Sequence, residues 1–133
     1  RQMIWTTGII GSVLLISGTI VTGSGPHSGS DKAEVAERLP FIVRDVARIH
    51  AVIAIIVLIV VAALWRLSSR AGLKEIARRA QLVAVLLILQ GALGYWQYFT
   101  GVPVLLVALH ITLASLTWIS IVRLQLTARS CTT

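Results

Sequence analysis

The stretch ARIHAVIAIIVLIVVAALW, residues 47–65, decides the fold. It is an unbroken apolar run from Ala51 to Trp65. With the residues before it, the run approaches the roughly 20 residues that a helix needs to cross a bilayer core of about 30 Å. The four apolar stretches of this kind are Met3–Thr22, Val46–Trp65, Ala80–Phe99 and Pro103–Val122. This pattern predicts an all-α integral membrane protein that forms a four-helix bundle.

The composition supports one membrane domain. The chain has 133 residues, of which 56% are hydrophobic and 13% are charged. A soluble domain of this size could not bury so much apolar side chain. We therefore expect a single transmembrane domain over residues 1–133, surrounded by membrane lipid.

The charged residues indicate how the chain is oriented. The net charge is +7, and the side with both termini carries eight cations and one acid. These are Arg1, Arg66, Arg70, Lys74, Arg78, Arg79, Arg123 and Arg129, with Glu75 as the acid. The other side carries Lys32, Arg38, Arg44 and Arg48, balanced by Asp31, Glu34, Glu37 and Asp45. The positive-inside rule then predicts that both termini are cytoplasmic. The cations are orientation signals, so no nucleic-acid partner is expected.

Two histidines lie inside the predicted spans. Ionisable residues within a membrane usually mark a functional site. His110 follows Pro103 by seven residues, which places it about 10 Å below the outer surface at helical rise. His50 has a similar depth, and both helices run inward. The two imidazoles can therefore face each other, as the axial ligands of a heme do, with iron bound by His50 and His110.

The histidine pair is also compatible with roles that need no heme. Each ring could form a hydrogen bond with a neighbouring helix, or the pair could relay protons. Zinc is disfavoured because it normally takes three or four protein ligands, and no third candidate lies near.

Further polar residues share this layer. Gln90, Gly94 and Gln97 follow the spacing i, i+4, i+7 on one face of the third span. A flat ring could lie against Gly94, and Gln97 could bond a ligand or water. The mid-span amide of Gln90 needs a partner. Arg48 could pair with heme propionates, or its side chain could extend to the lipid headgroups.

The remaining features are assigned structural roles. His27 is expected to be a loop residue, and residues 30–40 could form a short surface helix ended by Pro40. Cys131 is the only cysteine, which excludes a disulfide within the chain. The small residues of the first span are expected to pack helices closely in lipid. They are Gly8, Gly11, Ser12, Ser17 and Gly18.

Three segments together resemble a known family. VTGSGPHSG (residues 21–29), ARIHA (47–51) and LQGALGYWQYFTGVPVLLVALH (89–110) look like the C-terminal half of heme A synthase. The resemblance implies an eight-helix protein made of two pseudo-symmetric four-helix halves. Such an enzyme converts heme O to heme A by oxidising a ring methyl to a formyl group. It further implies that His50 and His110 are the axial ligands of a heme b cofactor, in a bacterial cytoplasmic membrane.

Two departures assign the chain to the cofactor half of that family. The N-terminal half has an E-x-x-H-R pattern, whereas here Ala47 precedes His50 by three residues and Ala51 follows it. The loop between Gly23 and Arg44 also lacks the cysteine pair of that half. No catalytic residue is therefore predicted. The implied partners are an N-terminal catalytic half, if the chain is a fragment, and an unidentified electron donor.

Three other functions are also compatible with the sequence. One is a stand-alone bis-histidine membrane cytochrome b for electron transfer. Another is a membrane assembly module without heme. The third is a homo-oligomer in which two copies of the chain together supply the eight helices.

Overall fold

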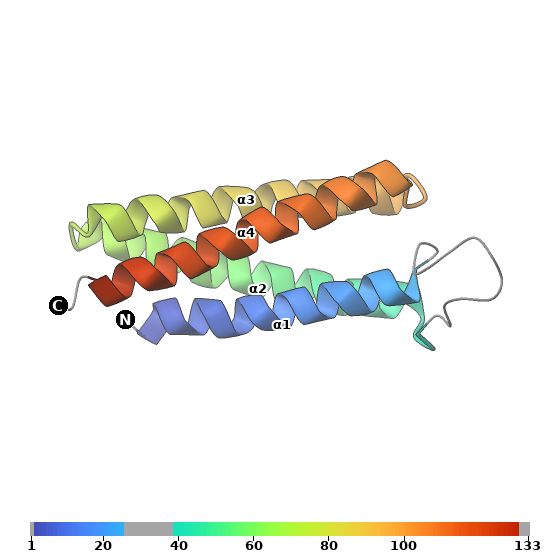
Figure 1. Ribbon diagram of the computed structural model, residues 1–133, viewed down its shortest axis with the longest axis horizontal. Helices are drawn as coiled ribbons and strands as arrows, with labels where there is room; N and C mark the ends of the chain where they lie inside the picture. The colour runs from blue at the N-terminus through green and yellow to red at the C-terminus, as the bar shows by residue number, and fades with distance from the viewer. Residues whose placement is uncertain (1, 26–38, 131–133) are drawn as a thin grey trace.

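The computed structural model describes residues 2–25 and 39–130 and contains four long helices there (Figure 1). They are α1 Gln2–Ser24, α2 Val43–Arg70, α3 Lys74–Phe99 and α4 Val104–Ser130. Each is long and apolar enough to cross a membrane. The predicted four-helix membrane bundle is confirmed. His27, Cys131 and most of the predicted surface helix lie outside the described residues.

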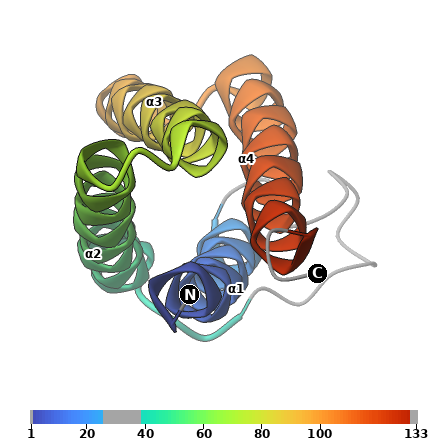
Figure 2. The same cartoon turned by 90° about the vertical axis from the view of Figure 1, so that its left-hand side faces the viewer.

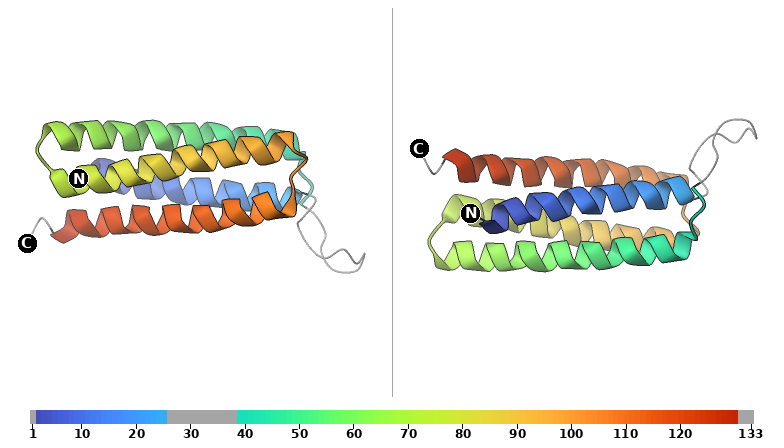
Figure 3. Two further views of the ribbon diagram at one scale, coloured as in Figure 1. Left: turned by 90° about the horizontal axis from the view of Figure 1, so that it is seen from above. Right: turned by 90° about the horizontal axis from the view of Figure 1, so that it is seen from below.

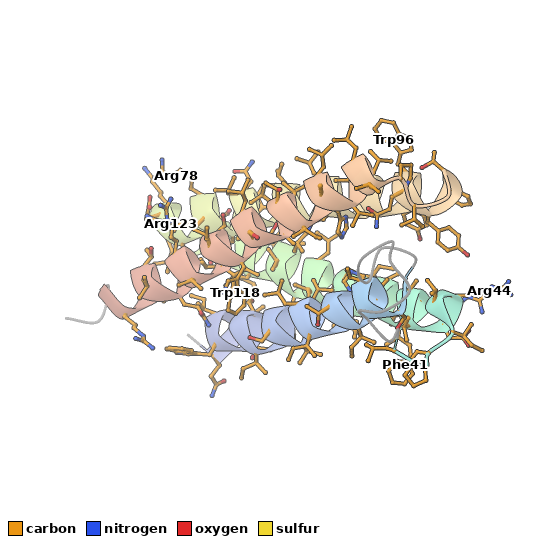
Figure 4. The ribbon with its side chains drawn as sticks, turned by 45° about the vertical axis from the view of Figure 1, so that its right-hand side comes forward. Phe41, Arg44, Arg78, Trp96, Trp118 and Arg123 are labelled. Atoms are coloured by element: carbon orange, nitrogen blue, oxygen red, sulfur yellow. The ribbon has the colours of Figure 1, made fainter. Side chains whose placement is uncertain are left out.

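The helices form a ring in chain order. Each contacts the next, and α4 closes the ring against α1, so α2 and α4 lie diagonally opposite each other (Figure 2). The start of α1 and the end of α4 lie at one end of the bundle (Figure 3). Arg78 and Arg123 lie at that same end, whereas Arg44 lies at the opposite one (Figure 4). This arrangement agrees with the charge asymmetry of the sequence.

The turn between α2 and α3 is much shorter than the polar segment of the sequence suggests. α2 continues past Trp65 to Arg70, and α3 begins at Lys74. The turn is a Schellman motif, in which Gly72 has φ 71° and the Leu73 N–H donates to the Ser68 carbonyl at 2.9 Å. Hydropathy marks the bilayer core, but the charged residues beyond it are good helix formers, so the helices extend into water.

The turn between α3 and α4 uses the same motif. Gly101 has φ 77°, and the Val102 N–H donates to the Gln97 carbonyl at 2.7 Å. The predicted span Pro103–Val122 begins one residue before the helix. α4 begins at Val104, and the Pro103 carbonyl accepts the first helical bond, from Val107 at 3.1 Å.

The bundle can be divided into two halves near the middle of each helix. The basic half comprises residues 2–13, 57–70, 74–87 and 117–130. The histidine half comprises residues 14–24, 43–56, 88–99 and 104–116. Among the described residues, every buried hydrophobic side chain belongs to the basic half. These are Ile4, Val57, Val61, Leu64, Ile76, Ala77, Ala80, Val83, Ala84, Leu87, Ile121 and Leu124.

The contact between α1 and α4 follows the same division. In the basic half, Gly11 lets α4 approach so closely that an added Cβ would lie 3.1 Å from Ile121 Cδ1 and 3.6 Å from the Trp118 ring. Gly8 faces Gln125 in the same way. Toward the histidine half the two helices diverge (Figures 1 and 2). The packed core therefore occupies one half of the bundle.

Candidate functional site

The two membrane histidines lie at matched depth in the histidine half. His50 is the eighth residue of α2 and His110 is the seventh of α4, both counted from the same end of the bundle. At helical rise this corresponds to roughly 9–11 Å. Because α2 and α4 are diagonal, the imidazoles come from opposite sides of the ring of helices.

His50 packs against α1. The Ser17 hydroxyl lies 2.8 Å from His50 Nδ1 and also donates to the Leu14 carbonyl at 2.8 Å. At Gly18, an added Cβ would lie 3.2 Å from His50 Cε1. A side chain at position 18 would therefore compete with the imidazole for space.

His110 packs in a similar way against α3. An added Cβ at Gly94 would lie 3.4 Å from His110 Cε1. The Gln90 amide bridges the two helices. In the amide orientation that satisfies these partners, its nitrogen lies 3.2 Å from both Nδ1 and the backbone carbonyl of His110, and its oxygen accepts from the Ala114 N–H at 2.9 Å. The mid-span amide thus has its partners on α4.

Each histidine is therefore supported by the helix that precedes its own in the chain. In both cases a glycine lies against the ring, and a polar side chain contacts Nδ1. Outer partners of this kind fix the ring orientation of metal-binding histidines. These contacts engage Nδ1 of each ring and not Nε2, the other nitrogen through which a histidine can bind iron.

The other predicted site residues lie differently. Gln97 is partly buried, and its side-chain oxygen is buried without a hydrogen-bond partner among the described residues. Such an orphaned acceptor is costly unless a further group pairs with it. The Arg48 side chain is 73% exposed and pairs with Asp45 at 3.9 Å. The structure brings Gln90 and Gly94 to His110, but it does not bring Arg48 to the imidazoles.

The donor set fits a heme better than a bare ion. Residues 2–25 and 39–130 contain no group of three or more histidine, cysteine, aspartate or glutamate side chains that could hold a metal ion. Two imidazoles at one level on diagonal helices match the two histidine ligands that a heme iron can take, and a porphyrin is flat and largely apolar. The histidine half lacks fully buried hydrophobic side chains and contains the orphaned Gln97 oxygen. These features fit a bundle interior completed by such a ring.

Two residues of the site were missed at the sequence level. Ser17 and Gly18 were assigned only to helix packing, yet they contact His50. Counting residues from the outer end of each helix could have found them. Gly18 lies six residues before the end of α1, and Gly94 lies five residues before the end of α3, so both share the level of the histidines.

The geometry so far defines a membrane four-helix bundle with paired imidazoles on diagonal helices. The COX15-CtaA family model, described as cytochrome oxidase assembly protein, matches residues 7–122. The chain belongs to this family, which confirms the resemblance to heme A synthases noted from the sequence. Neither the curated proteins nor the solved structures contain a match to the chain.

Proposed function

We propose that this chain is the heme b-binding, C-terminal half of a heme A synthase. In this role His50 and His110 coordinate the iron, and the complete enzyme oxidises a methyl group of heme O to the formyl group of heme A. Family membership supports the role in cytochrome oxidase assembly. The single observation that supports the heme site is the pair of imidazoles at matched depth, each fitted against a glycine of the neighbouring helix.

The residues of this chain would bind and orient rather than catalyse. With both histidines on its iron, a heme would supply one-electron transfer rather than oxygen chemistry. His50 and His110 would hold the iron, while Ser17 and Gln90 would orient the two rings. The lipid-facing helices would exclude bulk water from the ring. No described side chain is assigned to the oxidation, which the proposal leaves to an N-terminal half.

The heme site can be tested by spectroscopy on the purified chain. A reduced-minus-oxidised spectrum and a pyridine hemochrome assay would be recorded for the wild type, His50→Ala and His110→Ala. His27→Ala is the matched control, because His27 is the third histidine and is not a proposed ligand. We expect a low-spin b-type spectrum in the wild type and in the control. Either ligand substitution should give high-spin heme or none.

The assignment to one half of an enzyme needs a second measurement. Cells lacking heme A synthase would express this chain alone or with a catalytic half of the family, and extracted hemes would be separated by chromatography. We expect heme A only with both halves. Heme A from this chain alone would contradict the proposed division of labour. A b-type spectrum without heme A in either case would favour the stand-alone cytochrome.

A further inference from the structure

The hydrogen bonds of Ser17 determine where the His50 proton resides. A hydroxyl has one proton to donate, whereas a carbonyl can only accept. The Ser17 hydroxyl therefore gives its proton to the Leu14 carbonyl, at 2.8 Å, and accepts from His50 Nδ1, also at 2.8 Å. The contact with Ser17 favours a proton on Nδ1, which leaves Nε2 with a free lone pair.

The hydrogen bonds of Gln90 lead to the opposite assignment at His110. The His110 carbonyl can only accept and the Ala114 N–H can only donate, so these backbone groups fix the direction of the amide. Its oxygen faces the Ala114 N–H at 2.9 Å, and its nitrogen faces the His110 carbonyl at 3.2 Å. The same nitrogen lies 3.2 Å from His110 Nδ1, which must then accept. A neutral His110 consequently carries its proton on Nε2.

We infer that Ser17 and Gln90 hold the two histidines in opposite tautomers, which makes the two axial positions unequal. His50 presents an unprotonated Nε2 and is the fixed ligand. His110 can coordinate through Nε2 only after the Gln90 amide turns away from Nδ1, so it is the exchangeable ligand. Ser17 and Gln90 are thus positioning residues of different kinds. The ligand order rests on the proposed heme function, whereas the tautomers do not.

The tautomers can be measured without heme. The full chain, labelled with ¹³C and ¹⁵N in histidine, would be studied by NMR in heme-free form at about pH 8.5, where imidazoles of ordinary pKa are neutral. Signals would be assigned with His50→Ala and His110→Ala. We expect the proton on Nδ1 of His50 and on Nε2 of His110. The same tautomer at both residues would overturn the inference.

Matched variants test the cause of each tautomer. Gln90→Leu should release His110 into a mixture of tautomers, and Ser17→Ala should do the same for His50. Gln81→Leu on the exposed surface of α3 and Ser12→Ala on α1, where the hydroxyl bonds the Gly8 carbonyl, are the controls and should change neither ring. An unchanged His110 signal in Gln90→Leu would show that Gln90 does not determine the His110 tautomer.

The heme-loaded chain tests the ligand order. Carbon monoxide binds reduced iron where a histidine leaves, so its uptake reports the weaker axial bond. Ser17→Ala should increase the uptake and weaken heme retention by about tenfold, as lost outer-shell partners do. Gln90→Leu should decrease the uptake. A purely structural role for Gln90 predicts an increase instead and would contradict the inference. If the chain binds no heme, the proposed function fails, while the NMR result still decides the tautomers.

Discussion

The basic half and the histidine half are made from the same four helices, yet their interiors differ. The basic half contains all the fully buried hydrophobic side chains of the described chain, among them Val57, Val61 and Leu124. The buried side chains of the histidine half are two serines, Ser17 and Ser24. In lipid, apolar burial between helices gives little driving force, so close packing must hold the bundle together. The difference indicates that one half supplies that packing and the other supplies the site.

The largest expected effect comes from the packed core. Leu124 on α4 is fully buried against the neighbouring helices. Leu124→Ala should therefore cost about 2–5 kcal/mol in the free energy of unfolding. Leu106→Ala, at a half-buried position of the histidine half, should cost about 1 kcal/mol or less. Leu116→Ala on the same helix is the control, since Leu116 is 50% exposed. Unfolding in mixed detergent measures all three. Equal losses of unfolding free energy at positions 124 and 106 would contradict the proposed difference in packing between the halves.

Heme binding should reduce the difference in local stability between the basic half and the histidine half. A ligand present at 100 times its dissociation constant stabilises the folded state by about 2.7 kcal/mol. We expect hemin to raise the unfolding free energy by an amount of this order and to slow amide exchange mainly in the histidine half. The control is the double variant His50→Ala, His110→Ala, which should gain nothing. Slower exchange in the basic half alone would place the bound heme elsewhere.

Substituting the glycines beside the histidines should cost less stability than substituting Leu124, and Gly18 should be more sensitive than Gly94. Gly18→Ala places a Cβ 3.2 Å from His50, so displacing the ring should cost about 1–3 kcal/mol. Gly94→Ala places its Cβ at 3.4 Å from His110 and should cost less. Gly91→Ala is the control on α3, because nothing lies within 4 Å of its added Cβ. Thermal unfolding and heme retention would be compared. A result in which Gly91→Ala is the most damaging would contradict the assigned contacts.

The smallest effect is expected at Arg48. Its pair with Asp45 joins two exposed side chains at 3.9 Å, and such pairs contribute about 1 kcal/mol or less. Arg48→Gln should therefore leave the unfolding free energy of the heme-free chain nearly unchanged. Comparing its heme retention with that of wild type tests the predicted propionate contact. A loss confined to the heme-loaded form would support that contact, whereas an equal loss in both forms would mean that Arg48 stabilises the fold.

Much of the fold could be predicted because the relevant signals are local in sequence. Four long apolar runs require four spans, since a bilayer leaves backbone groups no partner outside a helix. Gly72 and Gly101 end helices because a left-handed residue is needed there. The spacing of Gln90 and Gly94 placed both on one face of α3, and the structure places that face against His110. The depth of each histidine follows from its distance along the helix.

The tertiary structure alone decided which helix faces which histidine and where the core lies. Ser17 and Gly18 look like ordinary packing residues until α1 is placed beside His50. Arg48 stands next to the site in sequence, yet its side chain points to the exposed surface. The physical reason is that lipid and protein interior are equally apolar. Hydropathy therefore cannot distinguish a lipid-facing Val52 from a buried Val57, and only the ring of helices separates them.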